Sequence, residues 1–257
     1  MSKKKFFFFL FLFVASVVTA QTVSPAQNTS AADTVYKKIL LVPYNPIMHL
    51  SDADIDIMEY MQQTENVIRA AFRKGLLQGI AAKLSGVCET FPMRGDIAKE
   101  TQKDLDMIYG SINYNMDTVF PVAHPVKDSL QKKSLFSKNH APKVKEIHDL
   151  KYMNITFSHP ELLKMLSAKY ENDLFVFLNQ FEIKTNYSDC LDLALKIYRR
   201  QLKVHYSVFD ATGKQLYGDV AVVDFPSNTN DISEIMRGTF PKISDYIVKS
   251  IPKKSLK

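Results

Sequence analysis

The alternation of apolar and polar positions along the chain predicts a set of β-strands. Residues 39–42 form an apolar run between Lys38 and Pro43, which is typical of a short strand buried on both faces. Residues 173–184 begin apolar and then alternate, so we expect a central strand whose far end reaches solvent. Two further alternating segments flank an Asp-Ala-Thr-Gly-Lys turn and predict a hairpin. These hairpin strands are expected at 198–209 and 216–225, and shorter strands at 87–93 and 152–157.

Apolar residues that recur at intervals of three and four predict helices between these strands. One stripe runs through residues 57–84 and predicts a single long helix that stops near Gly86. Gly75 and Gly79 lie inside it, which indicates close packing against a neighbouring element. Further helices are expected at 97–109, 160–170 and 232–251.

This order of elements predicts an α/β (α+β) fold. We expect a single mixed sheet packed by helices, with a C-terminal β-hairpin followed by a helix, in one domain over residues 36–253. Residues 110–150 are rich in Asn, Pro and Lys and predict an irregular basic insertion within that domain. Residues 21–35 are small and polar, which is typical of a flexible leader.

The N-terminus has the three-part pattern of a secretory signal peptide. Lys3, Lys4 and Lys5 precede an uncharged apolar run over residues 6–18, and Ala20 ends a small-residue cleavage site. A membrane anchor is the alternative, but a span needs about 20 apolar residues and this run is shorter. We therefore expect residues 1–20 to be removed, and we expect no transmembrane segment after cleavage.

Composition changes this picture little once the signal is set aside. The chain has 257 residues, 46% of them hydrophobic, and a net charge of +6. Three lysines leave with the signal, so 30 of the 33 basic residues remain against 27 acidic ones, a net charge of +3. That modest excess gives no reason to expect nucleic-acid binding.

The two cysteines, Cys88 and Cys190, are too few for a four-cysteine zinc site. In the oxidising compartment that export implies, they could form a disulfide that closes a long loop. Two buried free thiols are the alternative, and the sequence leaves both readings open because it does not show how near the two Cα atoms lie.

No motif for nucleophilic, metal, phosphate-loop or dinucleotide chemistry occurs, so we assign no catalytic, cofactor-binding or metal-binding residue and expect no cofactor. The most polar cluster is the acidic stretch 52–56. A calcium loop does not fit there, because Ile57 and Gln63 stand where the template needs Gly and an acid. Ser51 and Asp54 fit a capping box, so a capped helix start is the favoured reading of this stretch.

Lysines gather in the predicted insertion. They could form an interaction surface for an anionic partner, and a solvated loop is the alternative reading. The residues concerned are Lys127, Lys132, Lys133, Lys138, Lys143 and Lys145.

The order of elements also resembles a group of bacterial envelope domains. The similarity rests on the opening strand 38–44, the strand that starts at Asp173, and the hairpin 208–217 with its helix. The group comprises the curli-secretion lipoprotein, the outer-membrane activators of peptidoglycan synthases and the N-terminal domain of the Tol translocation protein. The resemblance implies a non-enzymatic domain that binds partner proteins. The lipid-acceptor cysteine of several members is absent here, and the 110–150 insertion is foreign to the pattern.

Taken together, these features predict an exported, soluble, non-catalytic binding or assembly component of a Gram-negative envelope. It would lie in the periplasm or on the periplasmic face of the outer membrane. Envelope proteins or polysaccharide are the expected partners, and the sequence leaves the oligomeric state open. Two alternatives remain: an exported hydrolase that uses acids near Asp52–Asp56, and a periplasmic carrier of a small ligand, which would need a closed apolar cavity.

Overall fold

The computed structural model describes residues 36–118 and 151–252. The predicted signal peptide (1–20), the leader (21–35) and the six insertion lysines from Lys127 to Lys145 lie outside the described residues.

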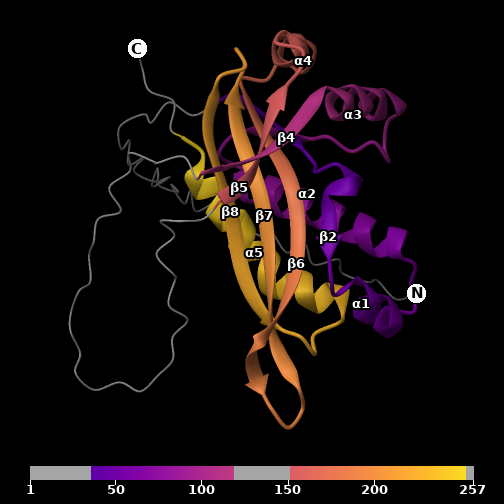
Figure 1. Cartoon of the computed structure of the whole chain (residues 1–257). Helices are drawn as coiled ribbons and strands as arrows, with labels where there is room; N and C mark the ends of the chain where they lie inside the picture. Colours follow the sequence, from indigo (N-terminus) through magenta and orange to yellow (C-terminus); the bar gives the residue numbers. More distant parts are fainter. Residues whose placement is uncertain (1–35, 119–150, 253–257) are drawn as a thin grey trace, which may run out of the picture. The chain divides into compact units, whose positions relative to one another are not determined.

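Six of the described strands form one mixed sheet in the order β3-β1-β6-β7-β8, with β2 also pairing with β6 (Figure 1). Strand β1 runs parallel to β3 and β6, whereas β6, β7 and β8 are antiparallel to one another. The predicted mixed sheet and its C-terminal hairpin are therefore confirmed. The strands are β1 (Lys38–Val42), β2 (His49–Ser51), β3 (Glu89–Pro92), β6 (Leu174–Asp192), β7 (Ile197–Asp210) and β8 (Gln215–Pro226).

Helices cover both faces of this sheet, because the central strands are apolar on both sides. Ile39 and Leu41 of β1 belong to the core beneath one set of helices, and Leu40 and Val42 belong to the core on the opposite face. The first core is covered by α1 (Asp54–Met61), α2 (Glu65–Leu84) and α5 (Ile232–Ser250). The second is covered by α3 (Lys99–Ser111), α4 (Leu162–Tyr170) and a small antiparallel sheet of β4 (Ile112–Thr118) and β5 (Lys151–Phe157).

Strand β6 changes the phase of its alternation partway along. Its register with β7 shifts between Leu178 and Gln180, which marks a β-bulge at Asn179. Before the bulge Val176 and Leu178 face the first core, and after it Phe181 faces the same core. The extra residue thus lets a bent strand keep one apolar face against the same helices.

The glycines of α2 mark its contact with α5, as predicted. A Cβ added at Gly75 would lie 2.6 Å from the Met236 sulfur, and one at Gly79 would lie 2.9 Å from the Ser244 hydroxyl. The absence of side chains at these two positions therefore lets the helices approach closely.

The prediction of one long helix over 57–84 was wrong, because two helices lie there. Helix α1 ends at Met61, the residue after it, Gln62, has a left-handed φ of 52°, and α2 starts after Thr64. Both helices pack on the same core, so the apolar stripe continues across the break and periodicity alone does not reveal it. The stop at Gly86 is confirmed, since this residue follows α2 with φ +85°.

The prediction of an irregular insertion at 110–150 was also wrong for its first residues. Residues 112–118 form β4, which pairs with β5 along its whole length. Most of its side chains are exposed or half-buried, so it carries the weak apolar pattern of a strand with one covered face. A second short strand, β2, follows a turn of 3-10 helix at Pro46–Met48 and was likewise missed.

Candidate binding site at the root of the β6–β7 hairpin

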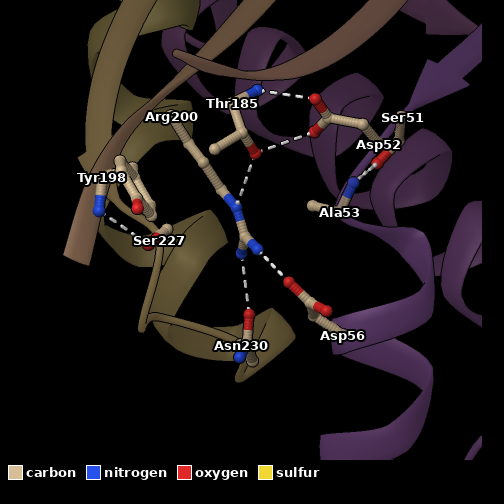
Figure 2. A network of polar contacts seen from close by, with 9 residues as sticks. All are labelled: Ser51, Asp52, Ala53, Asp56, Thr185, Tyr198, Arg200, Ser227 and Asn230. Carbon is tan, nitrogen blue, oxygen red and sulfur yellow. Dashed lines mark hydrogen bonds and ion pairs between the residues drawn. The ribbon is translucent and has the colours of Figure 1, made fainter. Parts of the chain in front are cut away.

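The acidic stretch 52–56 lies against β6 and β7, and its first carboxylate joins α1 to β6. The backbone N–H of Thr185 donates to one Asp52 oxygen at 2.8 Å, and the Thr185 hydroxyl donates to the other at 2.9 Å (Figure 2). Both oxygens of Asp52 are therefore engaged in holding the start of the helix on the sheet. The predicted capping box is not formed, because Ala53 is the N-cap residue and the Ser51 hydroxyl accepts from the Ala53 N–H instead.

The second carboxylate, Asp54, belongs to the first residue of α1 and is buried between α1 and α2. Arg69 donates to one of its oxygens at 3.1 Å, and His49 Nε2 lies 3.4 Å from the other. Burial alone would raise the pKa of the Asp54 carboxyl, but hydrogen bonds from His49, Ser51 and Arg69 outweigh it and hold that pKa below its ordinary value. The His49 ring stacks on Phe181 with centroids 4.7 Å apart, so this His–Asp pair lies inside the core.

The third carboxylate, Asp56, pairs with Arg200 of β7. The Arg200 guanidinium is buried and also donates to the Thr185 hydroxyl at 3.3 Å and to Asn230 Oδ1 at 2.7 Å. Figure 2 shows it reaching from β7 toward both α1 and the segment before α5. Arg200 thus connects α1, β6 and the β8–α5 connection through one side chain, as a planar multidentate donor can.

A pocket of about 310 Å³ opens beside this network. Its charged lining comes from Asp56, Arg200 and Lys196. Opposite charges in one small cleft suit a ligand that presents both hydrogen-bond donors and acceptors.

The remaining walls of the pocket are aromatic, aliphatic and amide groups. Tyr187 and Tyr198 stand edge to face with centroids 5.2 Å apart, beside Ile197. Ser227 closes another side, and its hydroxyl accepts from the Tyr198 N–H at 2.9 Å. These walls offer apolar contact and hydrogen-bonding groups to a molecule that enters the pocket.

The three acids that the sequence grouped together therefore diverge to three different partners. Arg200, which organises the pocket, was missed by the sequence analysis. A signal for it exists: Arg200 stands in phase with the inward-facing Leu202 and Val204 of β7, where an apolar residue is expected. A charged residue at an inward strand position indicates a buried polar partner, and here that partner comes from α1.

A second polar layer lies between β5 and the main sheet. The Met153 N–H donates to His205 Nδ1 at 2.9 Å, and Asn179 donates to the Met153 carbonyl at 2.8 Å. The Ser207 hydroxyl donates to Asn154 at 2.8 Å beside them. These contacts are buried and fix the β4–β5 sheet against β6 and β7, so we assign them to the fold.

The two cysteines are free thiols. Cys88 lies directly before β3, at the end of the sheet where β6 begins, and burial raises the pKa of its thiol. Cys190 is exposed near the other end of β6. Asp210 pairs with the start of β6 and Tyr198 pairs with Cys190, so at about 3.3 Å per residue along β7 the two sulfurs are separated by on the order of 40 Å. A disulfide between them within one chain does not fit this arrangement.

Within residues 36–118 and 151–252, no group of three or more His, Cys, Asp or Glu side chains is placed to hold a metal ion. Over the same residues, no helix combines the length and the apolar character needed to cross a bilayer.

Comparison with known proteins does not assign this chain to a family. No family model matches the chain, and a search of curated proteins finds no significant match.

Proposed function

We propose that this protein is an exported, non-catalytic binding component of a bacterial cell envelope, and that the pocket at the root of the β6–β7 hairpin receives its partner. The signal-peptide pattern of residues 1–20 supports export. The similarity of the element order to envelope domains supports a binding role.

The observation that carries this proposal is the contrast between the acids and the pocket. Asp52, Asp54 and Asp56 each have a partner within the fold, so these three acids do not form a pair of carboxylates arranged for hydrolysis. The pocket beside them offers apolar contact together with charged and amide groups. Such a lining supports a binding role for the pocket.

A segment of an envelope protein suits this lining better than a polysaccharide. Leu195 and Ile197 give the pocket aliphatic walls, which match apolar side chains and leave sugar hydroxyls without partners. The half-exposed Asp56 carboxylate, Lys196 and the Ser227–Asn228 edge then provide groups that a peptide backbone can hydrogen-bond.

Chemical crosslinking in cells tests the proposal. Asn228 is exposed at the pocket, so Asn228→Trp should fill it without removing a core contact. Lys103→Trp on the exposed surface of α3 is the matched control. We expect one crosslinked envelope protein with the wild type and with Lys103→Trp, and a reduction of about tenfold with Asn228→Trp, which corresponds to ~1.4 kcal/mol of binding free energy.

An adduct of equal yield in all three chains would contradict a role for the pocket. An adduct that glycosidases degrade and proteases do not would identify a polysaccharide partner and exclude the protein partner proposed here.

A further inference from the structure

The far part of the β6–β7 hairpin stands apart from the rest of the sheet. We call residues 186–198 the hairpin arm. Pairing of β2 with β6 ends at Ile183, and pairing of β8 with β7 starts at Arg199. Beyond those points β6 and β7 pair only with each other. Figure 1 shows the arm extending past α1 and α5 at the lower end of the view.

The tip of the arm exposes large apolar side chains. Leu193 is 83% exposed, Leu195 and Tyr187 are each 70% exposed, and Leu191 is 45% exposed. They follow one another over nine residues of a two-stranded element that has no core of its own. Contiguous exposed apolar side chains of this kind mark a surface that binds a protein or a membrane.

The polar groups of the tip are engaged within the arm. Asp192 accepts a hydrogen bond from the Leu195 N–H at 3.0 Å, which closes the turn. Asp189 pairs with Arg199 at 2.5 Å across the two strands. Asp189 is thus neutralised by Arg199, and Asp192 is held in the turn by the arm itself.

The side chains of the arm are ordered by chemistry along its length. Leu191 and Leu193 are outermost, the Tyr187–Tyr198 ring pair stands next, and Lys184 follows at the base, where Arg199 is already paired with Asp189 and Asp224. A bilayer leaflet presents the matching order of hydrocarbon, interface and anionic phosphate. Lys196 lies in the turn and has a long stem that can extend back toward the phosphates.

We propose that the hairpin arm docks the protein on an anionic phospholipid bilayer, with its leucines in the hydrocarbon boundary and its tyrosines at the level of the headgroups. A second copy of the chain fits the tip less well. Four such side chains offer on the order of 500 Å², whereas a standard protein interface buries about 800 Å² on each partner. A membrane surface requires no such matched area, and it binds reversibly through a few apolar groups. This inference goes beyond the proposed function. The two surfaces share residues of the arm such as Tyr187 and Leu195, whereas Leu191 and Leu193 do not line the pocket, so a change at Leu193 tests the arm alone.

The native Cys190 thiol provides a probe at the tip. In the full chain with Cys88→Ser, an environment-sensitive fluorophore on Cys190 reports the polarity around Leu191. Vesicles of phosphatidylethanolamine and phosphatidylglycerol should shift its emission to the blue, and lipids with quenchers on their acyl chains should quench it.

Sedimentation with the same vesicles measures the affinity without a label. We expect Leu193→Asp to weaken binding at least tenfold, while Ile97→Asp, at a site 67% exposed before α3, leaves it unchanged. Both variants share the same N-terminus, so residues 1–20 contribute equally to each. Circular dichroism that matches the wild type establishes that the variants are folded.

Three results would overturn the proposal. The first is an emission that vesicles leave unchanged. The second is an equal loss of sedimentation for Leu193→Asp and Ile97→Asp. The third is a blue shift without vesicles in a sample that sediments as a dimer, which would assign the tip to a second copy of the chain.

Discussion

At the scale of single residues, charged groups on the inner faces of this molecule serve to join elements. Asp54 shows this clearly, because its carboxylate is buried yet receives hydrogen bonds from His49, Ser51 and Arg69. Those donors stabilise the charged form against the cost of burial. A pKa held below its ordinary value in the folded state means that folding favours the ionised carboxylate.

The sign of the pH effect follows from that shift. Asp54 contributes stability above the ordinary carboxyl pKa of about 4, and this contribution is lost as the pH falls toward the lower folded value. Asp54→Asn should therefore lower the free energy of unfolding at neutral pH and flatten its decline under acid. Urea unfolding of both chains between about pH 6 and pH 3 measures this. Parallel pH profiles would show that Asp54 is not responsible.

At the scale of elements, glycines let strands and helices of different layers pack closely against one another. Gly218 of β8 is a case in which a rigid ring blocks any side chain. A Cβ added there would lie 2.1 Å from the Tyr152 hydroxyl and 2.6 Å from a carbon of its ring. The Tyr152 ring is rigid and buried, and its hydroxyl accepts from Gln215 at 2.8 Å. The contact between β5 and β8 therefore requires glycine at 218.

Gly218→Ala should destabilise the fold by about 1–3 kcal/mol, because the tyrosine has to move out of its place. Gly110→Ala in α3 is the matched control, since nothing lies within 4 Å of the added carbon. Ala favours helices over Gly by about 1 kcal/mol, so the control should be neutral or stabilising. Chemical denaturation of both variants tests the pair.

A double-mutant cycle checks the cause. Combining Gly218→Ala with Tyr152→Leu should destabilise less than the sum of the single changes, because the leucine leaves room for the added carbon. Additive effects would place the strain elsewhere.

Element types were largely predictable, and the breaks between elements were not. Strands such as β6 carry a strong apolar signal because both of their faces are buried, so the sequence locates them well. The division between α1 and α2 rests on the backbone conformation of Gln62, a residue with no special turn chemistry. Strand β4 has a single covered face and a polar sequence, so only its pairing with β5 identifies it.

At the scale of the whole molecule, the sheet divides into a supported part and an unsupported arm. Residues 174–183 of β6 lie between two cores and two neighbouring strands, whereas the strand pairing described for residues 187–197 is only between β6 and β7. Local stability follows contact with buried apolar groups. The protein should therefore open first at the arm and last in the middle of β6.

Hydrogen exchange measures this gradient directly. We expect backbone amides of residues 187–197 to exchange roughly a hundredfold faster than those of residues 175–178. Equal protection in the two segments would mean that the arm is stabilised by contacts that the isolated chain does not provide, such as association between copies.

By itself, the sequence determined the class of the fold, because the periods of its apolar positions follow from burial on one or two faces of an element. Only the tertiary structure decided which polar residues meet. Arg200 and Asp56 are 144 positions apart, and their contact depends on how α1 lies against β7. The same reason separates Cys88 from Cys190 and sends neighbouring acids to different partners. Contacts between distant residues depend on strand order and register, which local patterns do not encode.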